Sequence, residues 1–194
     1  MRSRARQFIL MAALFASAMG GRPALAGTVV ERTVAFVDKK PVLLSDVELT
    51  RALLKLDEKE ATERAIDEVL MFEEASRLVP AAPPEEEVTR AIGALLEKAG
   101  SGFTPAAFRR KALVQLAISN YIEPRLRPQV RVEDEAVRAA FNERVARDPQ
   151  TPLFNLVADA IRESLESRAL DQKIEEWVAS LRLREAIRLV PPRP

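Results

Sequence analysis

The chain contains neither histidine nor cysteine among its 194 residues. Their absence excludes Ser-His-Asp and Cys-His triads, thiol nucleophiles, disulfide bonds and nearly all zinc sites. The sequence also has no glycine-rich phosphate loop. It therefore predicts no catalytic residue, no cofactor-binding residue and no metal ligand, and we expect a protein that is not an enzyme and needs no cofactor.

Three kinds of site stay open on residue type alone. The 29 acidic residues could supply a catalytic carboxylate pair, although no feature singles one out. Ser45 could form a dyad with Lys39 or Lys40, but a serine at this position is better explained as a helix cap. Glu85 to Glu87 could bind a metal, yet adjacent side chains on a helix diverge. Solvated charges and helix caps account for all three more simply.

Aromatic residues are also scarce, at 5% of the chain. Strands are usually rich in aromatic and β-branched residues, so the composition favours a mainly helical fold. With 30 basic and 29 acidic residues the charges nearly balance, which is not the footprint of a protein that binds nucleic acid. Because disulfides are excluded, burial of apolar side chains must hold the fold together.

The first residues have the organisation of an export signal. Arginines within the first six residues precede an apolar run from Phe8 to Met19, and Ala24 and Ala26 form a small-x-small cleavage pattern. The run is much shorter than the roughly 20 residues of a membrane-crossing helix, so a retained anchor is the weaker alternative. We predict a signal peptide at residues 1–26, a periplasmic location, no membrane span after cleavage, and one mature domain at residues 27–194.

The mature chain is predicted to begin with a hairpin. Residues 31–37 and 42–44 alternate like strands on either side of a polar turn. Ser45 and Glu48 have the spacing of a capping box, so a helix is expected from Asp46. The charged cluster Asp57 to Glu60 is interpreted as a solvated connector after that helix.

Apolar residues at helical spacing predict five further helices. The expected helices are residues 61–78, a helix that starts with Glu85 to Glu87 and ends at Gly100 to Gly102, a helix capped by Thr104 that kinks near Asn120 or stops at Glu123 before Pro124, residues 133–147, and residues 152–182. Residues 27–147 would then form an N-terminal part, and residues 152–190 a closing helix and strand. The strand, Ala186 to Val190, is expected to pair with the hairpin, because a strand of this length cannot stand alone.

Several helices carry apolar stripes that are broad for a chain of this size. Examples are Met71 with Phe72, residues 113–116, and residues 153–157. Most of these side chains are expected in the core, and the rest could line an exposed apolar cradle. The predicted contacts of that cradle are the large side chains of Phe72, Phe108, Tyr121 and Phe154. Trp177 is expected to be buried between the last helix and the N-terminal helices.

Three stretches of the chain resemble a known family. Residues 33–47 and 154–190 are similar to the two ends of a SurA-type periplasmic chaperone, and residues 121–137 are similar to the segment that precedes the parvulin isomerase domain in relatives. In the family that isomerase domain follows at this point, whereas here only Arg147 to Pro152 occupy the gap. The resemblance implies a SurA N-terminal-like helical domain, with a small hairpin, that lacks the isomerase.

The resemblance also implies a function. It points to an ATP-independent holdase that binds unfolded outer-membrane or secreted proteins in the periplasm, without isomerase activity. The alternative is a non-enzymatic assembly or adaptor subunit that binds one dedicated envelope partner, such as a separate isomerase or a secretion machine. Both alternatives place the chain among peptide-binding or protein-binding proteins of the envelope.

Overall fold

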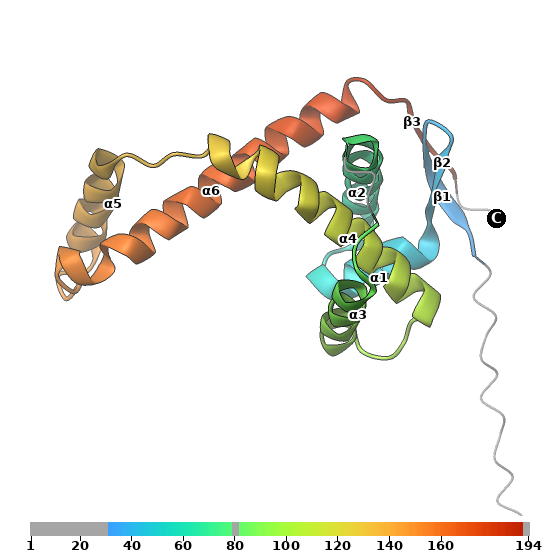
Figure 1. The fold of residues 1–194 in the computed structure, drawn as a ribbon, viewed down its shortest axis with the longest axis horizontal. Helices are drawn as coiled ribbons and strands as arrows, with labels where there is room; N and C mark the ends of the chain where they lie inside the picture. Colours follow the sequence, from blue (N-terminus) through green and yellow to red (C-terminus); the bar gives the residue numbers. More distant parts are fainter. Residues whose placement is uncertain (1–30, 79–81, 192–194) are drawn as a thin grey trace, which may run out of the picture.

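The computed structural model describes residues 31–78 and 82–191, so the predicted signal peptide lies outside the described residues. The protein is mainly helical with one small sheet, as the composition predicts (Figure 1). Its elements are β1 (Thr33–Val37), β2 (Lys40–Leu43), α1 (Leu44–Leu54), α2 (Glu58–Leu78), α3 (Glu85–Ala99), α4 (Pro105–Arg125), the 3-10 turn η1 (Arg127–Gln129), α5 (Asp134–Arg147), α6 (Phe154–Arg182) and β3 (Ile187–Leu189). Within the described ranges, no helix is long and apolar enough to cross a bilayer.

The sheet joins the two ends of the described chain. Its strand order is β2-β1-β3, and both pairs are antiparallel. The prediction that the closing strand pairs with the N-terminal hairpin is therefore confirmed. Beyond the strands, the N–H of Asp38 donates to the carbonyl oxygen of Ala186 at 2.7 Å, and the N–H of Val190 donates to that of Val34 at 2.8 Å.

The hairpin turns at Asp38, which has a φ of 52°. Aspartate tolerates this left-handed conformation better than most residues. Its side chain also accepts a hydrogen bond from the N–H of Ala186 at 2.9 Å. The turn thus holds the segment that leads from α6 into β3.

Two helix starts differ from the prediction. The helix α1 begins at Leu44, and no side chain caps it. Ser45 lies inside the first turn, where its hydroxyl accepts a hydrogen bond from Arg110 at 2.8 Å instead of capping. The capping box predicted for Ser45 and Glu48 is therefore wrong, because a partner distant in sequence engages the serine.

The capping box of this region lies at the start of α2. Asp57 Oδ1 accepts from the N–H of Glu60 at 2.8 Å, and Glu60 Oε2 accepts from the N–H of Asp57 at 3.2 Å. These two residues were expected to form a solvated connector, and the helix was expected from Ala61. The charged residues instead satisfy the free backbone amides of the first turn, so α2 begins at Glu58.

The other helix boundaries are close to the expected ones. Thr104 caps α4 by accepting from the N–H of Ala107 at 3.2 Å, as predicted. However, α4 does not stop at Glu123; it includes Pro124 and ends at Arg125. A proline this close to the end of a helix removes few backbone bonds, and η1 then continues the turn. The last helix starts at Phe154, two residues later than expected.

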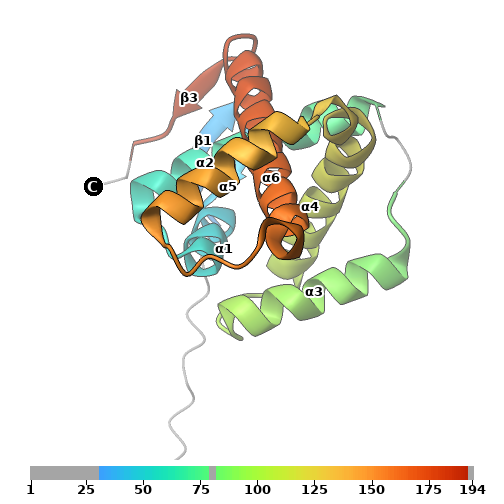
Figure 2. The same ribbon diagram turned by 90° about the vertical axis from the view of Figure 1, so that its left-hand side faces the viewer.

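The core of the protein lies in its body, which comprises the sheet, α1 to α4 and the second half of α6 (Figures 1 and 2). One cluster packs the inner face of the sheet, with Ala35, Val37 and Val42, against α2 and the end of α6. A second cluster joins α1, α3 and α4 around Phe108. A third joins α2, α4 and α6; here Trp177 is partly buried and stacks on Tyr121 with a centroid distance of 4.5 Å.

The remaining part of the protein, residues 133–168, is an arm that extends away from the body (Figure 1). It consists of α5 and the first half of α6, which pack against each other around Val137 and Ile161. Phe141 and Phe154 meet edge to face at 5.2 Å. Arg162 of α6 donates to the carbonyl oxygen of Val132 at 2.8 Å and so holds the start of the arm.

Candidate functional site

Two hollows of the body differ in their chemistry. The larger has a volume of about 500 Å³ and lies beside the β1–β2 turn, between α2 and the segment after α6. Its charged residues pair with one another: Lys40 with Glu73 at 3.2 Å, and Arg77 with Glu185 at 3.8 Å. Because these charges neutralise each other, this hollow presents no concentrated charge to a ligand.

The smaller hollow, of about 210 Å³, is a groove with a mainly apolar lining. Its walls come from β2, α2 and α4. The apolar lining residues are Val42, Ala65, Val69, Phe72, Leu113 and Val114. This volume is below the roughly 300–1,000 Å³ of small-molecule pockets, so the groove suits a few apolar side chains better than a cofactor.

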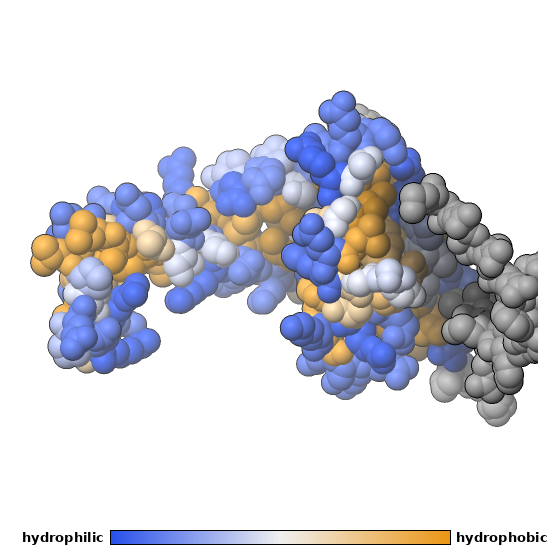
Figure 3. All heavy atoms as spheres, turned by 90° about the horizontal axis from the view of Figure 1, so that it is seen from below, coloured by the Kyte–Doolittle hydropathy of each residue, from blue (hydrophilic) through white to orange (hydrophobic). Residues whose placement is uncertain are grey.

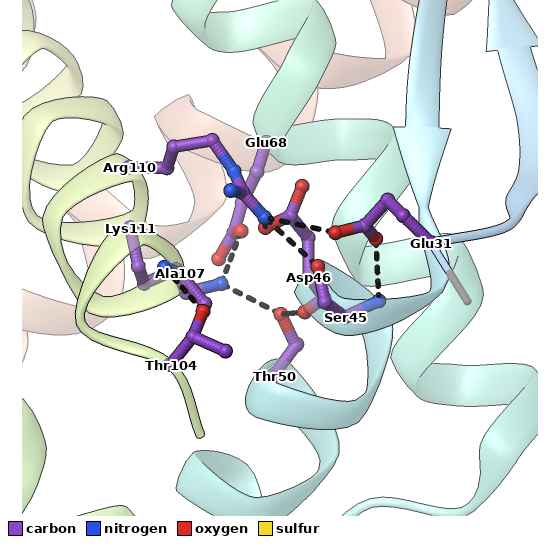
Figure 4. A network of polar contacts seen from close by, with 9 residues as sticks. All are labelled: Glu31, Ser45, Asp46, Thr50, Glu68, Thr104, Ala107, Arg110 and Lys111. Carbon is purple, nitrogen blue, oxygen red and sulfur yellow. Dashed lines mark hydrogen bonds and ion pairs between the residues drawn. The ribbon is translucent and has the colours of Figure 1, made fainter. Parts of the chain in front are cut away.

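A network of charged and polar residues forms one end of this groove (Figure 4). The ammonium of Lys111 in α4 is almost fully buried, donates to the hydroxyl of Thr50 at 2.6 Å, and forms an ion pair with Glu68 of α2. Thr50 in turn donates to the carbonyl oxygen of Asp46 at 2.8 Å. A buried ammonium is tolerated because both partners compensate its lost hydration.

Arg110 forms the rim of the same network. It donates to the hydroxyl of Ser45 at 2.8 Å and to the carboxylate of Asp46 at 3.1 Å, and Glu31 lies 3.8 Å away. Burial raises the pKa of Asp46, and the charge of Arg110 opposes this shift. The network binds α1, α2 and α4 to one another, so it fixes the width of the groove rather than offering a reactive group.

Apolar surface also lies at the tip of the arm (Figure 3). Leu153 and Leu156 are 72% and 71% exposed there. Phe154, between them, is only partly exposed, and the guanidinium of Arg138 lies 5.5 Å from the centre of its ring. Figure 3 shows this patch separate from the apolar surface of the body. Each of the two parts, the body and the arm, thus carries an apolar surface within the described residues.

The four predicted contact residues are not gathered in one place. Phe72 lines the groove, and Phe154 lies on the arm. Phe108 is 1% exposed and packs edge to face on Phe103 at 5.9 Å, so it belongs to the core. Tyr121 is also buried, beneath Trp177. Phe108 and Tyr121 thus lie in the second and third core clusters of the body.

Several exposed residues were not among the predicted contacts. Within the described residues, the large apolar ones are Leu54, Leu96, Leu153, Leu156, Leu183 and Leu189. Leu183 directly follows α6, and Leu189 is the last residue of β3. The sequence does not predict that Leu183 and Leu189 are exposed, because the apolar spacing around them is like that around buried residues. Leu156 lies off the apolar stripe of α6, and that position was an available signal of exposure.

The described residues offer little for metal or redox chemistry. In residues 31–78 and 82–191, no group of three or more acidic side chains is placed to hold a metal ion. Of the three glutamates that start α3, Glu85 pairs with Arg109 of α4 in a two-bond contact of 2.5 and 2.9 Å. No protein-family model matches this chain, and no curated protein matches it either.

Proposed function

We propose that this protein is an ATP-independent chaperone that holds unfolded outer-membrane or secreted proteins in the periplasm. The observation that carries the proposal is the exposure of apolar side chains on two separate surfaces, the groove of the body and the tip of the arm. Exposed apolar patches on a protein of this size mark sites for partners. The predicted export signal and the resemblance of the chain's ends to SurA-type proteins agree with this function.

The two surfaces suit an unfolded polypeptide better than a folded one. An unfolded chain is long enough to reach both surfaces and loses conformational entropy when it binds, so each contact is expected to be weak. Several weak contacts along one chain still give useful affinity through effective concentration. Charged residues of both signs surround the apolar lining, so binding should depend little on salt.

The proposal includes no isomerase activity. In relatives of the SurA type the isomerase follows the segment similar to residues 121–137, and here residues 148–153 connect α5 directly to α6. The competing function is an adaptor that binds one folded envelope partner. An adaptor would use the same apolar surfaces as a chaperone, so an experiment must distinguish the two functions.

The test uses residues 27–194 and an unfolded outer-membrane protein diluted from denaturant. We expect aggregation to be delayed without ATP, and the isomerisation of a proline peptide to stay at its uncatalysed rate. The double variant Leu153→Ser, Leu156→Ser should weaken the delay while leaving the melting temperature nearly unchanged, because both side chains are exposed.

Leu183→Ser is the matched control, since Leu183 is 90% exposed but lies outside the arm. This variant should delay aggregation as well as the wild type does. If the wild type delays the aggregation of no client at several-fold excess, but captures one folded partner from a periplasmic extract, the adaptor function replaces the chaperone function.

A further inference from the structure

Besides the groove and the tip of the arm, the free edge of β3 is suited to a partner. In the described ranges the sheet has only the order β2-β1-β3, so β3 is an edge strand, and Figure 2 shows it at the rim of the molecule. The bonds of Ala186 and Val190 to β1 flank the strand. In an antiparallel ladder, hydrogen-bonded pairs of residues alternate with pairs that are not hydrogen-bonded. The backbone of Arg188 therefore bonds to that of Phe36, and the backbone N–H and C=O groups of Ile187 and Leu189 point outward.

The opposite edge of the sheet is blocked. Pro41 is paired with Phe36 in the register of β1 and β2. The backbone groups of Phe36 bond to β3, so they do not bond to residue 41. The backbone nitrogen of residue 41 therefore points outward, away from β1, and because this residue is proline it carries no N–H. Edge prolines of this kind prevent strand addition. The two edges therefore differ: β2 is closed to a further strand, and β3 is open to one.

The side chains of β3 define what a fourth strand would need. Ile187 and Leu189 lie opposite Val37 and Ala35, on the face of the sheet that covers the core. Leu189 is 60% exposed, so this apolar face ends uncovered at the edge. Arg188 points to the other face, where its guanidinium lies 4.6 Å from the centre of the Phe36 ring.

We propose that β3 binds an extended segment of an unfolded client by antiparallel strand addition, with an acidic residue opposite Arg188 and an apolar residue on each side of it. This deepens the proposed function and rests on it. Two apolar side chains would extend the face formed by Ile187 and Leu189, and a carboxylate would pair with the guanidinium across the strands. Outer-membrane strands alternate apolar and polar residues, so they contain segments of this pattern.

A second copy of this chain fits the edge less well. Symmetric pairing of two β3 strands about Arg188 would place two guanidiniums directly opposite each other, which is unfavourable. A register centred on Leu189 would pair Ile187 with Pro191 of the other copy, which has no N–H to donate. The charge and the backbone of this segment thus favour a different sequence with an acidic centre.

The first test is a peptide titration of the protein comprising residues 27–194, followed by amide hydrogen exchange. The probe is acetyl-Thr-Val-Glu-Val-Thr-amide. We expect saturating peptide to slow exchange at the amides of Ile187 and Leu189 about tenfold, because both become hydrogen-bonded. N-methylation of the two valines should abolish this protection, and N-methylation of the glutamate should not, because its N–H points away from β3. Equal protection by the two methylated peptides, or none by the parent peptide, would overturn the proposal.

The role of the Arg188 charge is tested by reversing its sign. The wild type should bind the peptide with central glutamate about two- to fivefold more tightly than one with central lysine, and Arg188→Glu should reverse the order. This variant loses the contact with Phe36, so its melting temperature is measured alongside. A folded Arg188→Glu variant that keeps the wild-type preference would contradict the role of Arg188.

A third test separates this inference from the chaperone function. Leu189→Pro removes an outward N–H without removing a bond to β1, and Leu189→Ala is the control that keeps the N–H. We expect the proline variant alone to lose peptide protection at Ile187 and to delay client aggregation less. If both variants delay aggregation like the wild type, the chaperone function stands and strand addition fails. If the peptide protects β3 but the wild type delays no aggregation, edge binding stands and the chaperone function fails.

Discussion

At the scale of single residues, Lys111 is the side chain whose environment matters most to the body. Its ammonium is almost fully buried between Thr50 of α1 and Glu68 of α2. These partners are 61 and 43 residues away in sequence. The periodicity of α4 gives no sign of this arrangement, because a lysine on a helix is normally solvated. Its position could be learned only from the packing of three helices.

We predict that Lys111→Met lowers the free energy of unfolding by roughly 3–5 kcal/mol, because it leaves the carboxylate of Glu68 partly buried without its partner. Chemical denaturation followed by circular dichroism measures the change. The double variant Lys111→Met, Glu68→Leu should recover most of the loss, since it buries no unpaired charge. A double variant as unstable as the single one would show that packing, and not charge, controls this site.

Phe108 and Tyr121 show a second limit of sequence reasoning at this scale. Both were predicted to contact clients, and both are buried. The apolar stripe of α4 is broad enough to serve either purpose, and the sequence does not say which of its sides meets α1, α3 or α6. Phe72 was predicted from the same kind of stripe and does line the groove. Burial depends on neighbouring helices, which local periodicity cannot reveal.

At the scale of elements, the helix α2 depends on its start. Asp57→Ala removes the side-chain acceptor for the N–H of Glu60. We predict that it lowers the free energy of unfolding by about 1 kcal/mol, the usual cost of losing an N-cap. Lys59→Ala, in the same exposed turn, is the control and should have little effect. Thermal melts of both variants make the comparison; equal melting temperatures would contradict the cap.

The segment between α6 and β3 gives a pH-dependent prediction. The hydrogen bond with Asp38 raises the pKa of Glu185 above its ordinary value of 4.5, with burial and the charge of Asp38 adding to the shift. A raised pKa means that the folded protein binds this proton more tightly than the unfolded chain does. The resulting stabilisation is complete below the unfolded pKa and is lost as pH rises through the folded pKa.

We therefore expect Glu185→Gln to melt at a higher temperature than the wild type at pH 7, because glutamine keeps a donor for Asp38 and cannot ionise. The difference should shrink as the pH falls and Glu185 of the wild type becomes protonated, which its raised pKa places above the ordinary value of 4.5. Melts at several pH values, with Glu175→Gln as an exposed control, check the prediction. A variant less stable than the wild type at neutral pH would show that the charge pair with Arg77 dominates.

Elements were easier to predict than their ends. Apolar spacing and the prolines located α3 to α6 within a few residues, since these signals are local. The starts of α1 and α2 were wrong. Ser45 has capping chemistry, but it lies inside the first turn of α1 and accepts from the distant Arg110. Asp57 was interpreted as part of a connector, although it forms a capping box with Glu60. The pairing of β3 with β1 was predicted because the sequence has no other strand for it.

At the scale of the whole molecule, the sheet connects the first and last elements of the described chain. Deletion of residues 184–194 removes β3 and its bonds to Asp38 and Val34. We expect the free energy of unfolding to fall by about 3 kcal/mol or more, because several backbone bonds of about 1 kcal/mol each and the burial of Ile187 are lost together. Deletion of residues 192–194 alone, which keeps β3, should change the denaturation midpoint little.

The pairing of β1 with β3 also fixes when this protein can finish folding. Of the described elements, a ribosome makes β1 first and β3 last, and Asp38 meets Ala186 across 148 residues. Until that last segment emerges, β1 has an unpaired edge and one side of its core remains incomplete. Contacts this distant in sequence form late and slowly. The N-terminal sheet of a nascent chain therefore stays incomplete until the segment from Ala186 to Val190 has been synthesised.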